Sequence, residues 1–163
     1  MHKPILFVDI DGVLSLFGFA PGPVPPDARF VQVDGMPHFL SQRAADNLLS
    51  VLGDFEPVWC TGWEDRANDH LPHVLGLGPW PYLQFGESAA GAPHWKLPAV
   101  EAFAGARACA WIDDGLDGVV RSWAARRLAP TLLIETDPPV GLTAADAERL
   151  RGWAGGEARA ATP

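Results

Sequence analysis

The chain has 163 residues, 48% of them apolar, which suits one globular domain. We place this domain at residues 1–153 and expect a flexible tail at 154–163. A net charge of −8 argues against binding nucleic acid as a polyanion, because that needs a basic face, and admits nucleic acid only as a substrate. No apolar run near the start fits a signal peptide or a membrane span, and two cysteines cannot form a disulfide framework. We therefore expect a cytoplasmic protein without a membrane partner.

Short continuous apolar runs predict strands that are buried on both faces of a parallel sheet. The clear runs are 4–8, 57–60, 108–112 and 131–134, and a weaker one is 82–85. Helical patterns lie between them at 41–52, 64–75, 94–104 and 116–128. Thr143 and Asp146 resemble a capping box that opens a last helix to about Trp153. The alternation predicts an α/β fold: a three-layer, doubly wound (Rossmann-like) parallel sheet with strand order 3-2-1-4-5.

The connection after the first predicted strand is longer than an ordinary loop between a strand and a helix. In its second half Asp34-Gly35 separates two β-like runs, 29–33 and 36–40, and an Asp-Gly pair in that setting is a strong hairpin signal. Pro37 predicts that the second run lies at a sheet edge. We therefore expect a small β-hairpin flap within residues 15–40, placed to cover whatever the first strand presents.

Polar residues follow three of the predicted strands. Asp9 and Asp11 follow the first, Thr61 follows the second, and Asp113 and Asp114 follow the fourth. Parallel strands end at one edge of their sheet, and ligands bind at that edge where the strand order reverses. Any one of these acids could serve as a turn or cap residue, but clustered carboxylates repel and need a partner. A hard cation with oxygen ligands, such as Mg²⁺, is the simplest partner.

Four motifs occur in a fixed order along these elements: the sequence D-I-D-G at 9–12, Thr-Gly at 61–62, Lys96, and the acidic pair at 113–114. Together they resemble the haloacid dehalogenase (HAD) superfamily of phosphohydrolases, and the resemblance covers roughly residues 3–135. No insertion is long enough for a separate cap domain, so the chain looks like a minimal-cap member.

The resemblance implies roles for individual residues in a phosphatase. Asp9 would be the nucleophile that forms an aspartyl-phosphate, and Asp11 would act as general acid and then as general base. Thr61 and Gly62 would hold phosphoryl oxygens, and Lys96 would place positive charge beside the phosphate. Asp11 also favours phosphate chemistry, because the true dehalogenases of the superfamily lack an acid at that position.

The resemblance also implies a Mg²⁺ site. Its ligands would be Asp9, the backbone carbonyl of Asp11, and Asp113, with Asp114 bound directly or through water. Mg²⁺ and Lys96 together would stabilise charge on the transferring phosphoryl group.

The sequence leaves the substrate and some rival functions open. A phosphorylated substrate of unspecified size is expected, and a nucleotidase or nucleic-acid-end phosphatase is the alternative. A response-regulator receiver domain uses similar residues, but its acidic pair ends the first strand and its acceptor Asp the third, unlike here. A catalytically inactive HAD-like binding module is the non-enzyme alternative.

Several aromatic and sulfur-containing residues lie close to the motifs. Trp63 directly follows Thr61-Gly62, and Trp95 directly precedes Lys96. Either side chain could stack on a planar leaving group or anchor its loop. The predicted strand order places the first strand between those that carry Cys60 and Cys109, which separates the two cysteines by about 9–10 Å. This distance is too long for a disulfide, so buried free thiols are expected. Some flap residues could contact substrate: Phe30, Gln32, His38 and Phe39.

Overall fold

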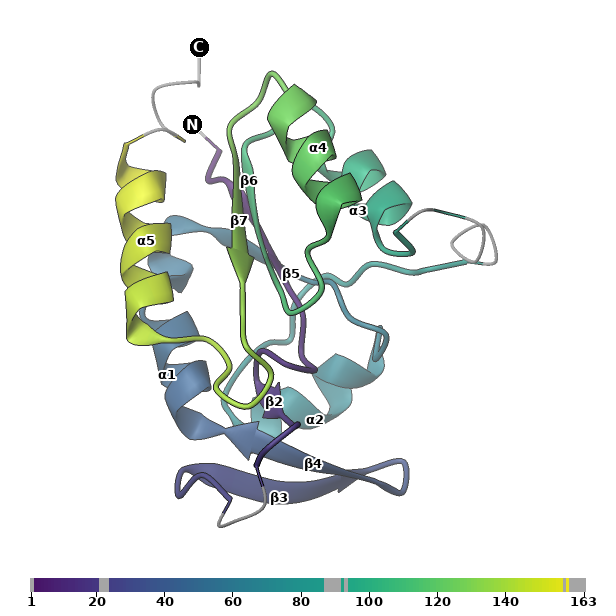
Figure 1. Cartoon of the computed structure of the whole chain (residues 1–163), viewed down its shortest axis with the longest axis vertical. Coiled ribbons are helices and arrows are strands. Elements are labelled where there is room, and N and C mark those ends of the chain that lie inside the picture. Colours follow the sequence, from purple (N-terminus) through teal and green to yellow (C-terminus); the bar gives the residue numbers. More distant parts are fainter. Residues whose placement is uncertain (1, 21–23, 87–91, 93, 157, 159–163) are drawn as a thin grey trace.

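The fold is built around a four-stranded parallel sheet (Figure 1). The computed structural model describes residues 2–20, 24–86, 92, 94–156 and 158. In sheet order the strands are β5 (Glu56–Trp59), β1 (Ile5–Val8), β6 (Cys109–Asp113) and β7 (Thr131–Glu135). The four clear apolar runs are therefore strands, as predicted, and they occupy the predicted order 2-1-4-5.

The weaker predicted strand, at 82–85 and third in chain order, does not form. Tyr82 forms an isolated bridge with Trp59. In this bridge the amide of Trp59 donates to the carbonyl of Pro81, and the amide of Leu83 donates to the carbonyl of Trp59. Parallel pairing continues in register, so residues 83–85 would need partners at 60–62. β5 ends at Trp59, and the chain turns at Thr61 and Gly62 instead of continuing as a strand. Toward the other end of β5, Pro57 has no N–H to donate. The pairing on this edge of β5 therefore stops after one residue.

Helices cover both faces of the sheet, which confirms the layered α/β arrangement (Figure 1). The helices are α1 (Gln42–Leu49), α2 (Arg66–Val74), α3 (Leu97–Ala104), α4 (Gly118–Arg126) and α5 (Ala144–Gly155), with a short 3₁₀ turn at Leu52–Asp54. Alternate residues of β1 enter different cores. Leu6 and Val8 join the core under α1, α2 and α5, whereas Ile5 and Phe7 join the core under α3 and α4.

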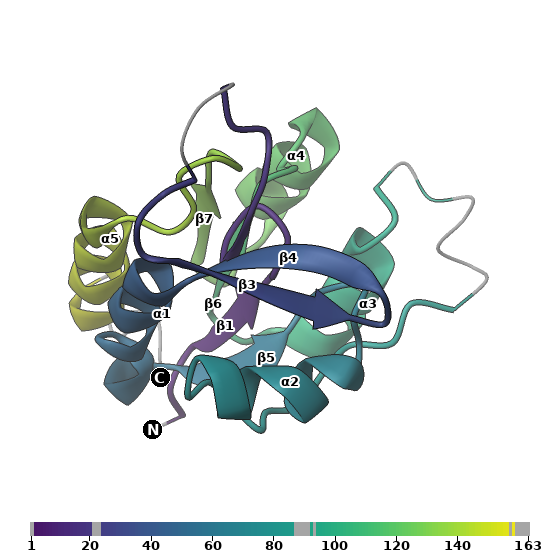
Figure 2. The same cartoon turned by 90° about the horizontal axis from the view of Figure 1, so that it is seen from below.

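A second, antiparallel sheet forms the predicted flap. Its strands are β2 (Ser15–Leu16), β4 (Met36–Ser41) and β3 (Ala28–Val33), in that order. Figure 2 shows the β3–β4 ribbon lying across the end of the parallel sheet. The turn sits at Asp34-Gly35, both with positive φ, as the hairpin signal predicted. The edge position predicted from Pro37 is wrong for the strand as a whole, because β4 is the middle strand. Pro37 is tolerated because the two-residue β2 pairs only with Leu40 and Phe39.

The helix boundaries follow local capping. Asp117 caps α4 by accepting hydrogen bonds from the amides of Val119 and Val120, so α4 begins later than predicted. The capping box of Thr143 and Asp146 is present at the start of α5. Within the described ranges, no helix combines the length and the apolar character that crossing a membrane requires. Most of the predicted tail, residues 157 and 159–163, lies outside the described residues.

We expect Thr143→Ala to lower the free energy of unfolding by about 1 kcal/mol, because the amide of Asp146 loses the hydroxyl that caps it, while the Asp146 carboxylate can still accept from the amide of residue 143. Urea denaturation followed by circular dichroism measures this change. Glu148→Ala, at an exposed position of the same helix, is the matched control and should shift the unfolding midpoint little. Equal midpoints for the two variants would contradict the capping role.

Candidate functional site

Three carboxylates meet where β1 and β6 end. Asp9 follows β1 directly, Asp113 is the last residue of β6, and Asp114 comes next. The backbone holds the two ends together, since the amide of Asp9 donates to the carbonyl of Ile112 at 3.0 Å. One carboxylate oxygen from each acid lies within 4.8 Å of the other two, with Asp9 and Asp113 buried. This group of hard oxygen donors can hold a metal ion.

Lys96 lies within the same cluster, although it is far from these acids in the sequence. Its Nζ lies 2.8 Å from Oδ2 of Asp9 and 2.6 Å from Oδ2 of Asp113, and the residue is only 4% exposed. Lys96 immediately precedes α3, so the packing of that helix fixes where its ammonium lies. The cluster therefore contains one ammonium and three carboxyl groups, so a further cation is needed to balance the charge when all three are ionised.

Burial and like charges shift the titration of the cluster. Burial raises the pKa of Asp9 to about 8, against the opposing effect of Lys96 and with a further contribution from Asp113. Burial would lower the pKa of Lys96, but the charges of Asp9 and Asp113 outweigh it and raise that pKa. Burial, together with Asp113, also raises the pKa of Asp114. Without a cation, the raised pKa values of Asp9 and Asp114 therefore favour the protonated form of these two carboxyls more than in free aspartate.

Asp11 lies apart from the three carboxylates. Its Oδ2 accepts a hydrogen bond from the indole N–H of Trp63 at 3.0 Å, and its Oδ1 lies 3.5 Å from Nδ1 of His38 on the flap strand β4. Oγ of Ser15 lies 2.9 Å from the same His38 nitrogen. The Asp11 carboxyl is half-exposed. The flap therefore reaches the second acid of D-I-D-G and leaves the carboxyl accessible.

Thr61 and Gly62 lie at the neighbouring strand end. Thr61 is fully buried, and its hydroxyl oxygen accepts a hydrogen bond from the amide of Trp63 at 3.3 Å. Gly62 is exposed, and a Cβ built there would lie 3.7 Å from Cη2 of Trp95. These two residues form a turn at the end of β5, the strand that pairs with β1.

Gly12 allows the loop after β1 to close against the acidic pair. Its φ is +78°, and a Cβ at this position would lie 2.4 Å from Oδ2 of Asp114. Only glycine fits both the backbone conformation and the space. The glycine of D-I-D-G is therefore part of the way the site is built.

Two residues that the sequence did not single out support the loops of the site. Thr136, after β7, donates from its hydroxyl to the carbonyl of Gly12 at 2.8 Å, and its amide donates to the carbonyl of Asp113. Nε2 of His94 donates to the carbonyl of Gly115 at 3.1 Å. A buried polar residue after the last strand was the available signal for Thr136, whereas nothing in the sequence pairs His94 with Gly115.

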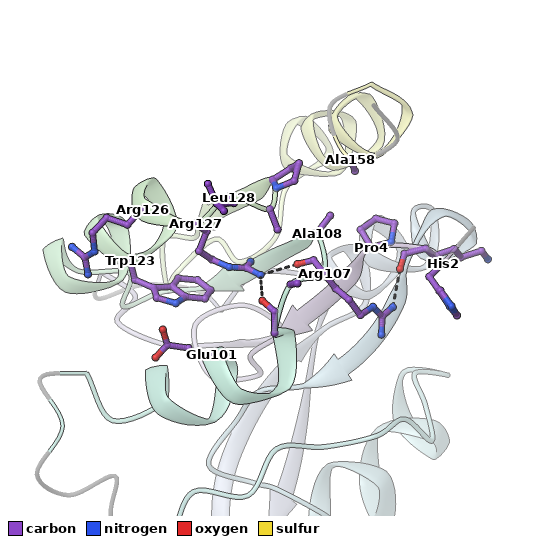
Figure 3. Close-up of a pocket in the computed structure, with 15 residues that line it drawn as sticks. His2, Pro4, Glu101, Arg107, Ala108, Trp123, Arg126, Arg127, Leu128 and Ala158 are labelled. Atoms are coloured by element: carbon purple, nitrogen blue, oxygen red, sulfur yellow. Dashed lines mark hydrogen bonds between the residues drawn. The ribbon is translucent and has the colours of Figure 1, made fainter. Parts of the chain in front are cut away.

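A separate cavity of about 710 Å³ opens at the opposite, amino-terminal end of the strands (Figure 3). Arg127 crosses it, stacks on Trp123 at 4.9 Å, and donates to the carbonyls of Gly105 and Arg107. Arg107 in turn donates to the carbonyl of Lys3. These hydrogen bonds tie chain segments together, and the cavity lining contains none of the motif residues. The carboxylate cluster is therefore the better candidate for chemistry.

Cys60 and Cys109 are both free and buried, as expected.

No protein-family model matches the chain, and no curated protein matches it.

We expect the metal-free protein to lose stability as the pH rises from about 4 to about 8. Over this interval folded Asp9, with its raised pKa, holds a proton that the unfolded chain has released, because its ordinary pKa is 3.8. The stabilisation is complete below the ordinary value and is lost as the pH passes the folded value. Mg²⁺ should reverse the loss, since it stabilises the ionised form.

Urea denaturation across this pH range, in chelator and in Mg²⁺, measures the effect. Asp9→Asn is the control, because its amide does not titrate. Parallel stability curves for the wild-type protein and Asp9→Asn in chelator would contradict the role given to Asp9.

Proposed function

We propose that the chain is a Mg²⁺-dependent phosphohydrolase of the HAD type that works through an aspartyl-phosphate on Asp9. The observation that carries the proposal is the buried Lys96 ammonium shared by Asp9 and Asp113, with Asp114 beside them. A carboxylate nucleophile, a fixed cation and a group of metal ligands thus lie within a few ångströms. The resemblance of the four motifs to this superfamily supports the same reading.

The donor set fits Mg²⁺. Asp9, Asp113 and Asp114 offer only carboxylate oxygens, which hard divalent cations prefer, and the backbone carbonyl of Asp11 is a further oxygen ligand in this proposal. When bound, Mg²⁺ supplies positive charge to the phosphoryl oxygens.

In the first step an Asp9 oxygen bonds to phosphorus while the ester bond from phosphorus to the leaving oxygen breaks. Asp11 gives its proton to that oxygen. Its half-exposed position supports this role, because the leaving group must depart toward solvent. The Trp63 indole holds the Asp11 carboxyl at this opening, and Lys96 keeps the charge of Asp9 compensated before attack.

In the second step water attacks phosphorus, and the bond from phosphorus to Asp9 breaks. Asp11, now ionised, removes the proton from that water. Inorganic phosphate leaves, and the Asp9 carboxylate is restored. The hydroxyl of Thr61 and the turn at Gly62 lie at the adjacent strand end, where they support binding of phosphoryl oxygens.

We expect hydrolysis of an aryl phosphate to require Mg²⁺ and to fall to background in excess chelator. Added Ca²⁺ should inhibit, because this larger ion accepts more oxygen ligands and can engage both oxygens of Asp9. Release of the aryl alcohol gives the rate. Full turnover in chelator would overturn the metal assignment, and no turnover with any phosphomonoester would favour the inactive binding module.

The two acids of D-I-D-G should fail in different ways. Asp9→Asn should abolish turnover, because an amide is too weak a nucleophile. Asp11→Asn should slow turnover about 10²–10⁴-fold, the usual worth of acid–base help, and it should accumulate phosphoenzyme when the leaving group needs no proton. Rapid quench followed by intact mass measures the added phosphate.

Asp69→Asn, the same change at an exposed position of α2, is the control and should behave like the wild-type protein. Phosphate found on Asp113, or near-normal turnover by Asp9→Asn, would mean that the roles are assigned wrongly.

A further inference from the structure

The two tryptophans that flank the motifs have different environments. Trp63 is 6% exposed; its N–H is bonded to Asp11, and the His38 ring packs against it with centroids 4.6 Å apart. Trp63 is thus an anchor with no free surface for a ligand. Trp95, in contrast, is 43% exposed. A large aromatic side chain left in water at the rim of a polar site is a candidate contact surface.

Trp95 lies beside the residues proposed to bind phosphate. The Lys96 ammonium is 5.1 Å from the centroid of its ring, and the same ammonium is 2.8 Å from Oδ2 of Asp9. The far edge of the indole faces Gly62, at 3.7 Å from a Cβ built there. The Trp95 ring therefore lies next to the Lys96 ammonium and also next to the turn that follows β5.

Trp95 is held in place before any ligand arrives. The ring of Phe85 packs against it at 4.8 Å between centroids and an interplanar angle of 65°. Phe85 is itself tied down, because its amide donates to Oε1 of Glu64 at 3.0 Å. An aromatic surface that is already ordered loses little freedom when a second ring stacks on it.

We propose that Trp95 stacks on a planar aromatic ring in the leaving group, so that the enzyme prefers phosphomonoesters whose leaving group carries an aromatic ring over those whose leaving group carries none. This inference rests on the proposed function. Asp9 and Lys96 are buried whereas Trp95 is exposed, so in this proposal the phosphoryl group enters the cluster while the leaving group stays outside, on the side where Trp95 meets solvent. The net charge of −8 disfavours a polyanion, which leaves a single ring, carried by a nucleoside monophosphate or by a phosphorylated aryl group.

Steady-state kinetics on three substrates tests the inference: a nucleoside 5′-monophosphate, phenyl phosphate and glycerol phosphate. Base–aromatic stacking corresponds to about 5- to 150-fold in binding. Trp95→Ala should lower the ratio of kcat/KM for the aromatic over the alkyl substrate by this factor, mainly through KM. Trp95→Phe keeps a ring and should restore most of the ratio. The substrate whose kcat/KM falls more in Trp95→Ala, the nucleotide or phenyl phosphate, shows whether the stacked ring is a nucleobase or an aryl group.

Phe103→Ala is the matched control, since Phe103 has the same 43% exposure but lies at the other end of α3, and it should leave the ratio unchanged. An unchanged ratio in Trp95→Ala, or equal losses on all three substrates, would overturn the inference, since Trp95 would then only position Lys96. In that case turnover of glycerol phosphate by the wild-type protein would still uphold the proposed function.

Binding gives an independent readout. In the Asp9→Asn background, the Kd of phenyl phosphate relative to that of inorganic phosphate, measured by calorimetry, should rise when Trp95→Ala is added. A constant relative Kd would again count against stacking.

Discussion

The buried ammonium of Lys96 is the interaction on which the rest of the site depends. It lies between the carboxylates of Asp9 and Asp113, which otherwise would repel each other at the ends of adjacent strands. Removing one partner from such a buried group leaves an uncompensated charge, which costs far more than the pair contributes. The start of α3 and the ends of β1 and β6 are therefore fixed relative to one another by charge as well as by packing.

This arrangement places two acids that are only two positions apart in different environments. Asp9 is enclosed with its cation, whereas Asp11 reaches solvent and is held by Trp63 and faced by His38 of the flap. A carboxylate used for bonding to phosphorus benefits from exclusion of water, while one that exchanges protons needs access to it. In the proposed mechanism, the contact of the flap with Asp11 alone therefore leaves Asp9 enclosed in the core and the acid–base group accessible.

Local and periodic features were predictable from the sequence, whereas contacts between distant residues were not. The runs at β1 and β6 are continuous because both faces of those strands are buried, and Asp34-Gly35 marks a turn whatever surrounds it. The false strand at 82–85 arose because its pairing partner belongs to another segment, which turns at Thr61 and Gly62 where β5 ends. The bond from Trp63 to Asp11 spans 52 positions, and no pattern along the chain predicts it. The proximity of Asp9 and Asp113 was foreseeable, since parallel strands end at one edge.

The contact of Gly12 with the Asp114 carboxylate links two positions that lie more than a hundred residues apart. The space for any side chain at 12 is already taken, so position 12 can change only if position 114 shrinks, and even then its left-handed backbone disfavours other residues. Substitutions at positions 12 and 114 are therefore coupled, and few single substitutions at either position are compatible with the residue at the other. A lineage that gave up the acid at 114 would first relax the constraint on the glycine, and loss of that glycine would then make the change hard to reverse.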